Sequence, residues 1–265
     1  MKTGYLGPEG SYSCLAAKKM TPTGDIKAYD SFPLVFRALV SGEVDCIVIP
    51  VENSLNGEVT QNIDLLQETE GIIAVEECAI KIEHRLAVLC GADNKNIKRI
   101  YSHRQALDQC SKYLFENFPN AQLIAAPSTS ASLDMVKTKE DACIVGAHTK
   151  RDGITLSDKN ISDYEGNTTR FLKVVRGSVD ENKHSAKIYF SVTCPNVSGG
   201  LLKLLQIVAT HGLNMTKLQS RPLKEAADEF AFFIEIECDY SRPEVRQAVE
   251  DIKSAALSFK LLGTY

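Results

Sequence analysis

The stretch Asp45-Cys46-Ile47-Val48-Ile49-Pro50 is apolar at every position between its two ends. A strand without polar residues at alternate positions is buried on both faces, as in a parallel sheet that helices cover on both sides. Strand-like segments at residues 2–7 and 26–29 precede it, and each is followed by a segment with helical character. This alternation predicts a doubly wound α/β sheet.

The two helices between these strands have recognisable starts. Ser11 follows the turn Gly7-Pro8-Glu9-Gly10, and we expect it to be the N-cap of a helix that runs through Lys19. Ser31-Phe32-Pro33 opens the second helix, whose apolar residues at 32, 35, 36, 39 and 40 have helical spacing.

A polar cluster, Val51-Glu52-Asn53-Ser54-Leu55-Asn56-Gly57, follows the buried strand directly. In open α/β sheets, ligands bind at the carboxyl ends of the strands, which favours a binding role for Glu52, Asn53 and Ser54. The alternative is an Asx-turn that caps the next helix, expected to start near Thr60. The residues themselves favour the two interpretations equally.

A second lobe is expected after residue 80, because the strand-like segments at 72–82 and 85–89 interrupt the earlier alternation of strands and helices. Ser102-His103-Arg104-Gln105 then opens a predicted helix that runs to about Phe118, with Ser102 as its cap and its first amides as an anion site. Gln105 and Gln109 share one face of this helix. The alternative is an ordinary soluble helix with a polar side and a surface histidine.

The second lobe continues with predicted strands at 122–126 and 142–146. Between them, Pro127-Ser128-Thr129-Ser130-Ala131 is expected to open another helix, whose start is rich in hydroxyl groups and free amides. Such a start is suited to binding a carboxylate.

The chain is expected to return to the first lobe through Gly166-Asn167-Thr168-Thr169-Arg170-Phe171, which leads into a strand at 171–175. Thr169 offers a hydroxyl that donates or accepts, and Arg170 offers a rigid fork for a carboxylate. The alternative is a loop-to-strand junction with a structural arginine. Two lobes joined by two crossings would form a cleft that all four polar clusters can face.

A polar linker at 177–184 precedes a second pattern of elements. Strands are expected at 187–194, 213–221, 229–238 and 259–265, with helices at 201–211 and 242–258. This β-α-β-β-α-β order predicts a ferredoxin-like domain, suited to side-by-side dimerisation.

The composition bounds the class of protein. The 265 residues carry a net charge of −4 without a basic stripe, so nucleic acid is not an expected partner. No apolar run approaches the length of a membrane span, and the N-terminus lacks the core of a signal peptide. The eight cysteines form no Cys-x-x-Cys pair and the five histidines are dispersed, so we expect reduced thiols, no zinc site and a cytoplasmic location.

The chain resembles the prephenate dehydratases, bacterial enzymes of phenylalanine biosynthesis, over essentially its whole length. Five segments in the family's order carry the resemblance: Gly7-Pro8-Glu9-Gly10-Ser11-Tyr12-Ser13, Pro50-Val51-Glu52-Asn53-Ser54, Ser102-His103-x-Gln105-Ala106-Leu107-x-Gln109-Cys110, Ser128-Thr129 and Thr169-Arg170-Phe171. Arg104 stands where the family usually has Pro, at a helix start, and we expect little effect.

The C-terminal part resembles the ACT regulatory domain that is fused to these enzymes. The family segments Gly-Ala-Leu, Leu-Asn and Glu-Ser-Arg-Pro read here as Gly199-Gly200-Leu201, Leu213-Asn214 and Gln219-Ser220-Arg221-Pro222. Gly200 replaces Ala and Gln219 replaces Glu. Both lie in the regulatory site, so they bear on effector affinity and not on the chemistry.

The resemblance implies an α/β catalytic domain of two lobes, like that of periplasmic binding proteins, followed by the ACT domain. The catalytic domain would span residues 1–178, with lobe one at about 1–80 and 165–178 and lobe two at about 81–164. The ACT domain would span 185–265.

The resemblance also implies a reaction. Prephenate loses carbon dioxide and its ring hydroxyl to give phenylpyruvate, and because aromatisation drives the step, no metal or redox cofactor is expected. By resemblance, Thr169 donates to the departing hydroxyl, mainly as an electrostatic effect. The implied catalytic residues are Thr169, Arg170, Phe171 and Gln109. The implied substrate-binding residues are Glu52, Asn53, Ser54, Ser102, His103, Ser128, Thr129 and Thr168.

Feedback control follows from the same resemblance. Phenylalanine is expected between two paired ACT domains, in a homodimer or homotetramer. The implied effector-binding residues are Gly199, Gly200, Leu201, Leu213, Asn214, Gln219 and Ser220.

Two other functions stay open at this point. Arogenate dehydratase performs the same chemistry on the amino analogue, and one substituent separates the two substrates. A two-lobe protein that only binds an anion is the rival from another class, and the fused ferredoxin-like domain weighs against it.

Overall fold

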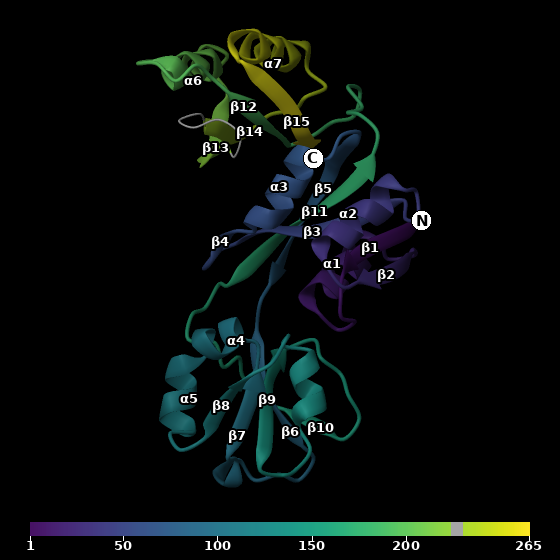
Figure 1. Ribbon diagram of the computed structural model, residues 1–265, viewed down its shortest axis with the longest axis vertical. Helices are drawn as coiled ribbons and strands as arrows, with labels where there is room; N and C mark the ends of the chain where they lie inside the picture. The colour runs from purple at the N-terminus through teal and green to yellow at the C-terminus, as the bar shows by residue number, and fades with distance from the viewer. Residues whose placement is uncertain (224–229) are drawn as a thin grey trace. The chain divides into compact units, whose positions relative to one another are not determined.

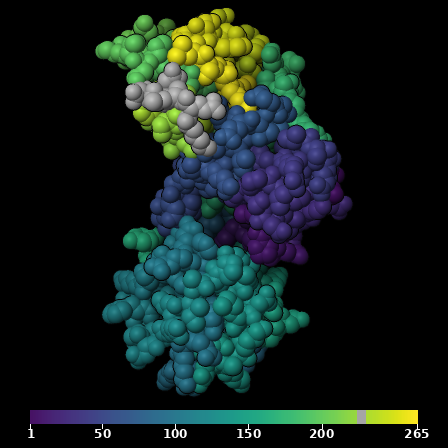
Figure 2. Space-filling view, viewed as in Figure 1, coloured from purple at the N-terminus to yellow at the C-terminus, as the bar shows by residue number. Residues whose placement is uncertain are grey.

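The computed structural model describes residues 1–223 and 230–265 (Figure 2). It divides into two compact units, each built from separate stretches of the chain. The first unit comprises Met1–Val35, Val48–Val59 and Cys78–Phe171, and the second comprises Phe36–Ile47, Thr60–Glu77 and Leu172–Tyr265. In the described ranges, none of the helices has the length and apolar character needed to cross a membrane.

The first unit contains the predicted doubly wound strands. Its first sheet uses β1 (Lys2–Leu6), β2 (Asp25–Tyr29), β3 (Cys46–Asn53), β4 (Gly57–Glu58) and the start of β11 (Thr168–Arg176). The order is β11-β3-β1-β2, with β1 parallel to β2 and β4 antiparallel on the end of β3. Helix α1 (Tyr12–Met20) buries Cys14 and Ala17 against this sheet, and Ser11 caps it by accepting from the Cys14 amide. The expected cap is therefore confirmed.

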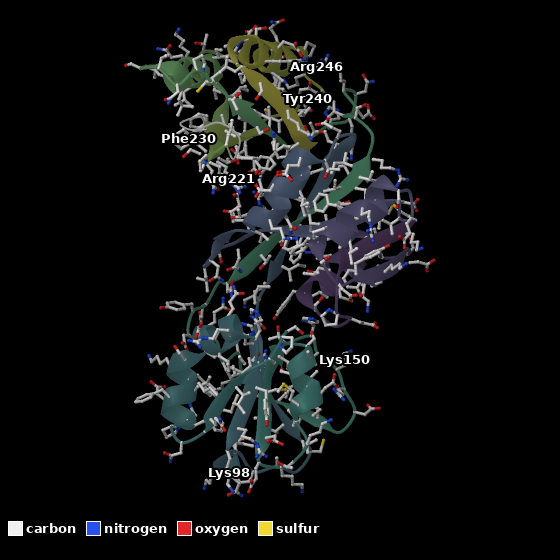
Figure 3. All side chains as sticks on the ribbon, in the orientation of Figure 1. Lys98, Lys150, Arg221, Phe230, Tyr240 and Arg246 are labelled. Atoms are coloured by element: carbon white, nitrogen blue, oxygen red, sulfur yellow. The ribbon has the colours of Figure 1, made fainter. Side chains whose placement is uncertain are left out.

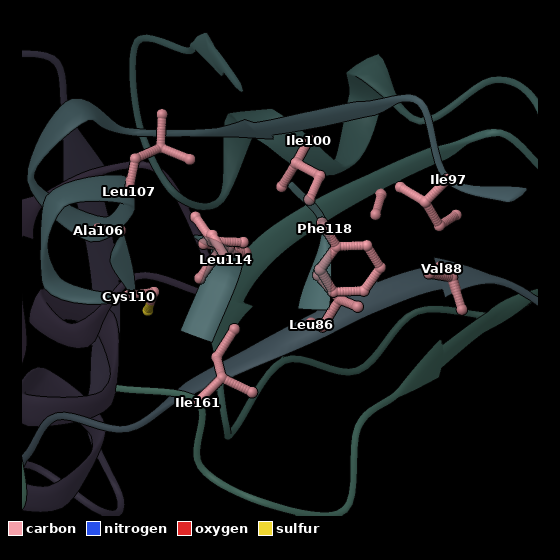
Figure 4. Close-up of a cluster of buried hydrophobic side chains, with 12 residues drawn as sticks. Leu86, Val88, Ile97, Ile100, Ala106, Leu107, Cys110, Leu114, Phe118 and Ile161 are labelled. Atoms are coloured by element: carbon pink, nitrogen blue, oxygen red, sulfur yellow. The ribbon is translucent and has the colours of Figure 1, made fainter. Parts of the chain in front are cut away.

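The second sheet of this unit belongs to the predicted second lobe. Its strands are β6 (His84–Leu89), β7 (Arg99–Ser102), β8 (Gln122–Ala125), β9 (Asp141–Gly146) and β10 (Ile154–Leu156), in the order β10-β6-β9-β7-β8. Figure 4 shows its core, where Leu86 and Ile100 of the sheet meet Leu114 and Phe118 of the helical layer. Four elements were not predicted from the sequence: β4, β7, β10 and the short 3-10 helix η1 (Asn94–Asn96).

The single helix expected from Ser102 to Phe118 is wrong, because the chain forms two helices, α4 (Arg104–Gln109) and α5 (Ser111–Asn117). The physical reason is a distant carboxylate. Asp163 accepts from the amides of Lys112 (2.9 Å) and Tyr113 (3.2 Å) and from the Ser111 hydroxyl. It thereby starts a new helix at Ser111, where a continuous helix would have bonded those amides internally.

The helix expected after Pro127 is also a correction. The segment forms a short 3-10 helix, η2 (Ala131–Met135). Ser128 accepts from the Ala131 amide (2.9 Å), and Ser132 donates to the Thr129 carbonyl (2.6 Å). Hydroxyl side chains that take these backbone partners compete with α-helical hydrogen bonds, which explains the tighter turn.

The second unit contains the predicted ferredoxin-like order. Its elements are β12 (Lys187–Thr193), α6 (Gly200–Thr210), β13 (Asn214–Pro222), β14 (Phe230–Glu237), α7 (Pro243–Ala255) and β15 (Ser258–Thr264) (Figure 1). Their sheet order is β13-β14-β12-β15. The strand expected from 229 is described from Phe230 onward, and Glu229 lies outside the described residues.

This unit also holds helical and strand segments from the first half of the chain: α3 (Thr60–Glu68) and parts of α2 (Phe32–Val40) and β5 (Ile72–Lys81). Gly263 of β15 pairs with Ala74 of β5. Arg221, labelled in Figure 3, bonds Asp64 of α3 at 2.7 Å. Lys260 donates to the carbonyls of Gln67 (2.7 Å) and Thr69 (2.8 Å), so a C-terminal strand caps the end of α3.

Candidate active site

The site is organised by the start of β11. Gly166 has a φ of +84°, which favours glycine, and the strand begins at Thr168, three residues earlier than the sequence pattern predicts. Because side chains alternate along a strand, Thr169 and Phe171 share one face, and both line a cavity of about 240 Å³. Arg170 is not among the lining residues.

The cavity lies within the first unit. Its lining residues come from several elements, among them the end of β3, the start of β6, helix α4 and the start of β11. Most of its lining side chains can form hydrogen bonds. The polar lining residues are Tyr12, Ser13, Asn53, His84, His103, Gln105, Gln109, Thr129, Asn167 and Thr169.

Asn53 joins the turn after β3 to the threonine of β11. Its Oδ1 accepts from the amides of Leu55 and Asn56, each at 3.1 Å, which is the Asx-turn of the structural interpretation. Its Nδ2 donates to Thr169 Oγ1 (3.0 Å) and to Asn167 Oδ1 (2.7 Å). The same side chain therefore makes the turn and orients the cavity, so the two interpretations do not exclude each other.

The Thr169 hydroxyl accepts one hydrogen bond and can still donate its own proton. A hydroxyl has one donor and two acceptor positions, and the amide of Asn53 occupies an acceptor position. Thr169 Oγ1 can therefore donate to an acceptor placed in the cavity.

Asn167 and His84 are site residues that the sequence analysis did not select. Asn167 is 1% exposed, and its Nδ2 donates to Gln109 Oε1 at 3.2 Å. His84 is 4% exposed, and its Nε2 lies 2.9 Å from the same oxygen. Burial lowers the pKa of His84, which favours the neutral ring. Asn167 belongs to the opening segment of β11 and could have been selected, whereas nothing near His84 in the sequence marks it.

Tyr12 was also missed, although it belongs to the Gly7–Ser13 motif. Its hydroxyl donates to the Glu83 carbonyl and accepts from the Glu83 amide at 2.9 Å. Burial raises the pKa of Tyr12 to about 12, so the phenol stays protonated. Its ring meets His148 edge-on at 4.6 Å. Tyr12 thus holds the segment between β5 and β6 from which His84 follows.

The other residues predicted around β11 lie beside the cavity. Arg170 pairs with Glu52 at 3.1 Å, with 17% of the arginine side chain exposed. Ser54 accepts from the Thr168 amide at 3.0 Å, and Thr168 donates to the Gly166 carbonyl. These contacts join β3 to β11, and a substrate role for these four residues stays a prediction.

The predicted role of Ser102 as a helix cap is wrong. Ser102 is the last residue of β7, a strand that was not predicted from the sequence; it is fully buried and donates to the Ile144 carbonyl at 2.8 Å. His103 is the cap instead, with Nδ1 accepting from the Gln105 amide at 3.3 Å. His103 and Thr129 line the cavity, whereas Ser128 is occupied in its own turn and is not among the lining residues.

The predicted effector residues fall into three groups along the chain of the second unit. Gly199 (φ +81°), Gly200 and Leu201 form the start of α6, while Leu213 and Asn214 follow its end. The eleven-residue helix α6 lies between Gly199 and Leu213, and its length corresponds to about 16 Å. The Asn214 amide donates to Glu237 at 2.7 Å. Gln219 and Ser220 lie further along β13. One chain alone therefore does not bring Gly199 and Asn214 together.

In the described residues, no group of three or more His, Cys, Asp and Glu side chains has the arrangement of a metal site. All eight cysteines are free thiols, and burial raises the pKa of Cys110 and of Cys143 to about 12.

Two family models match the chain. The model described as prephenate dehydratase matches residues 3–178, and the model described as the ACT domain matches residues 188–254. A relative from Lactococcus lactis subsp. lactis, named prephenate dehydratase, is 33% identical over 100% of this chain and 97% of its own length.

Solved structures share the fold over the whole chain. The prephenate dehydratase of Arthrobacter aurescens, solved in complex with L-Phe, has a TM-score of 0.89 at 24% identity and covers 100% of this chain and 90% of its own. GqqA, described as a novel type of quorum quenching acylase, has a TM-score of 0.88 at 25% identity, with 100% and 97% covered.

Proposed function

The chain belongs to the prephenate dehydratase family and carries an ACT domain, and we propose how its cavity performs the family reaction and how phenylalanine controls it. It is a lyase of aromatic amino-acid biosynthesis. In its reaction, prephenate takes up one proton in total and yields phenylpyruvate, carbon dioxide and water. The carboxylate's bonding electrons move into the ring as carbon dioxide leaves, and the ring hydroxyl departs with that proton.

Thr169 is the donor to the departing hydroxyl. The observation that carries this assignment is the 3.0 Å contact from Asn53 Nδ2, which fills an acceptor position of Thr169 Oγ1 and leaves its proton to point into the cavity. An unperturbed threonine is a weak acid, so its contribution is to stabilise developing negative charge by a pre-aligned hydrogen bond.

The substrate carboxylates are bound by polar side chains that line the cavity, namely His103, Gln105 and Thr129, together with the amide of Gln109. Phe171 forms an apolar wall for the ring. Arg170, Glu52, Ser54 and Thr168 hold β3 against β11 and so keep Asn53 in reach of Thr169. This assignment gives Arg170 a supporting role, because its fork is already turned to Glu52.

Phenylalanine binds where two ACT domains pair. The separation of Gly199 from Asn214 along α6 supports this arrangement, since a second copy can bring its Asn214 to the Gly199 segment of the first. The solved relative that contains L-Phe supports the choice of effector. The active assembly is then a homodimer or a pair of dimers.

The catalytic region is proposed to span 1–178 and the ACT domain 185–265, with the linker between them. A cytoplasmic location fits a biosynthetic enzyme with eight free cysteines.

Turnover of the purified chain with prephenate and with arogenate, each with and without phenylalanine, tests these proposals. We expect phenylpyruvate from prephenate, a much lower rate with arogenate, and inhibition by phenylalanine. Preference for arogenate would overturn the assignment of prephenate as the substrate, but not the assignment of a decarboxylating dehydration. Turnover of prephenate that phenylalanine does not change, together with absent binding in calorimetry, would overturn the effector assignment alone.

A further inference from the structure

His84 is held rigidly at the edge of the cavity. It is the first residue of β6, its amide donates to Asn160 Oδ1 at 3.0 Å, and its carbonyl accepts from the Ile161 amide at 2.9 Å. Only 4% of the residue is exposed. The backbone therefore leaves the imidazole little freedom of position.

The partner of the ring decides its tautomer. Nε2 lies 2.9 Å from Gln109 Oε1, and a carbonyl oxygen can only accept, so Nε2 carries the proton. Nδ1 is buried and has no donor or acceptor partner among the described residues. With the proton on Nε2 and none on Nδ1, the ring is neutral, in agreement with the lowered pKa of His84.

Gln109 is thereby oriented from two sides. Its Oε1 receives a second donor, Asn167 Nδ2, at 3.2 Å. A carbonyl oxygen has two lone pairs, and these two donors fill both of them. If the amide turned over, its NH₂ group would meet two donors and lose both hydrogen bonds.

We propose that His84 is a positioning residue of the cavity, which locks the amide of Gln109 so that Gln109 Nε2 faces the substrate. This deepens the proposed function and rests on it. Gln109 Nε2 has no acceptor among the residues that the structure describes, and Gln109 lines the cavity. The locked amide thus presents a donor to an acceptor oxygen of the substrate, a carboxylate or carbonyl oxygen.

A purely structural role for His84 is the rival explanation, because the residue follows the segment that Tyr12 holds. Two substitutions of equal length separate the roles. His84→Gln keeps an N–H donor near the position of Nε2, whereas His84→Met fills similar space without one. Under the proposal, His84→Met lowers kcat/KM by roughly ten- to a hundredfold, the range expected for one well-placed hydrogen bond, and His84→Gln restores most of it.

Gln109→Met combined with His84→Met sharpens the test. Once the amide is gone its orientation no longer matters, so the double variant should be no worse than Gln109→Met alone. Ser157→Ala is the structural control, since it removes a hydroxyl that accepts from the Leu86 amide of β6 at 3.1 Å and leaves the hydrogen bonds of His84 in place. We expect a lower Tm for it with kcat/KM within about threefold of wild type. Equal losses in His84→Met and His84→Gln, or fully additive losses in the double variant, would overturn the proposal.

The tautomer gives a readout that needs no turnover. Long-range ¹H–¹⁵N spectra of the five histidines, assigned by the signal missing from His84→Gln, should show His84 as the Nε2–H form at neutral pH. An Nδ1–H form would refute the locked amide even in an active enzyme. The expected tautomer in a protein without prephenate turnover would instead count against the proposed function.

Discussion

Asn53 Nδ2 lies 3.0 Å from Thr169 Oγ1, while Oδ1 of the same side chain takes the amides of Leu55 and Asn56. The amide cannot turn over, because its oxygen is anchored in the turn. A residue that closes a loop therefore also decides which way a hydroxyl on another strand points.

The hydroxyl of Thr169 is expected to matter to the rate and not to the fold. Losing one donor to developing charge typically costs about 3–4 kcal/mol, so Thr169→Ala should lower kcat roughly a hundred- to a thousandfold, and Thr169→Ser should keep much of the activity. Thr155→Ala is the matched control, because its hydroxyl donates to Cys90 Sγ at 3.4 Å and Thr155 is not among the residues that line the cavity. Steady-state kinetics decide the matter, and near-normal turnover by Thr169→Ala would refute the role.

Asn53→Asp tests the orientation of that hydroxyl. A carboxylate still accepts the amides of Leu55 and Asn56 but cannot donate to Thr169, so Thr169 donates to the carboxylate and turns its proton away from the cavity. We expect a loss in kcat close to that of Thr169→Ala. Combining both changes should add little to either, since the two residues act as one unit. Independent, multiplicative losses would contradict the coupling.

Asp141 is expected to govern acid stability. Burial acts to raise its pKa, but the Arg99 guanidinium at 2.6 Å and the Thr138 and Lys137 donors outweigh burial and hold the pKa at about 2. The pKa of Asp141 in the folded protein therefore lies below the ordinary value for an aspartate, 3.8. The contribution to stability, about 2 kcal/mol, is therefore complete above pH 4 and is lost as the pH falls toward 2.

Asp141→Asn should remove that contribution and leave a buried, mismatched amide, at a cost of roughly 2–4 kcal/mol at pH 7. Glu140→Gln is the control, because its pair with Lys98 is exposed and worth little. Thermal unfolding at pH 7 and pH 3 measures both. A gap between wild type and Asp141→Asn that does not shrink at pH 3 would contradict the assigned ionisation.

Gly200→Ala restores the residue that the family usually has, yet we expect it to be costly here. An added Cβ would overlap the carbonyl oxygen of Pro195, so the 195–199 loop would have to move. Such overpacking typically costs about 1–3 kcal/mol. The Tm should fall and phenylalanine binding should change, as read by calorimetry, with Ser198→Ala as the neighbouring control. An unchanged Tm would contradict this expectation, because it would show that the 195–199 loop moves without a measurable cost in stability.

Much of the fold was predictable because its determinants are local. The apolar run at 46–49 requires a strand covered on both sides, the Ser11 hydroxyl can reach the amide three residues ahead, and the order of elements after residue 187 permits few topologies. Thr169 and Asn53 could be selected for the same reason, because polar residues at strand ends are unusual enough to notice.

The tertiary structure decided what depends on partners far along the chain. Asp163 divides a predicted helix at Cys110, and the Ile144 carbonyl draws Ser102 into the core. His84 meets Gln109 only because β6 and α4 converge on one cavity. Periodicity and capping rules describe neighbours within a few residues, whereas the orientation of a buried amide is set by whichever donors the fold brings to it.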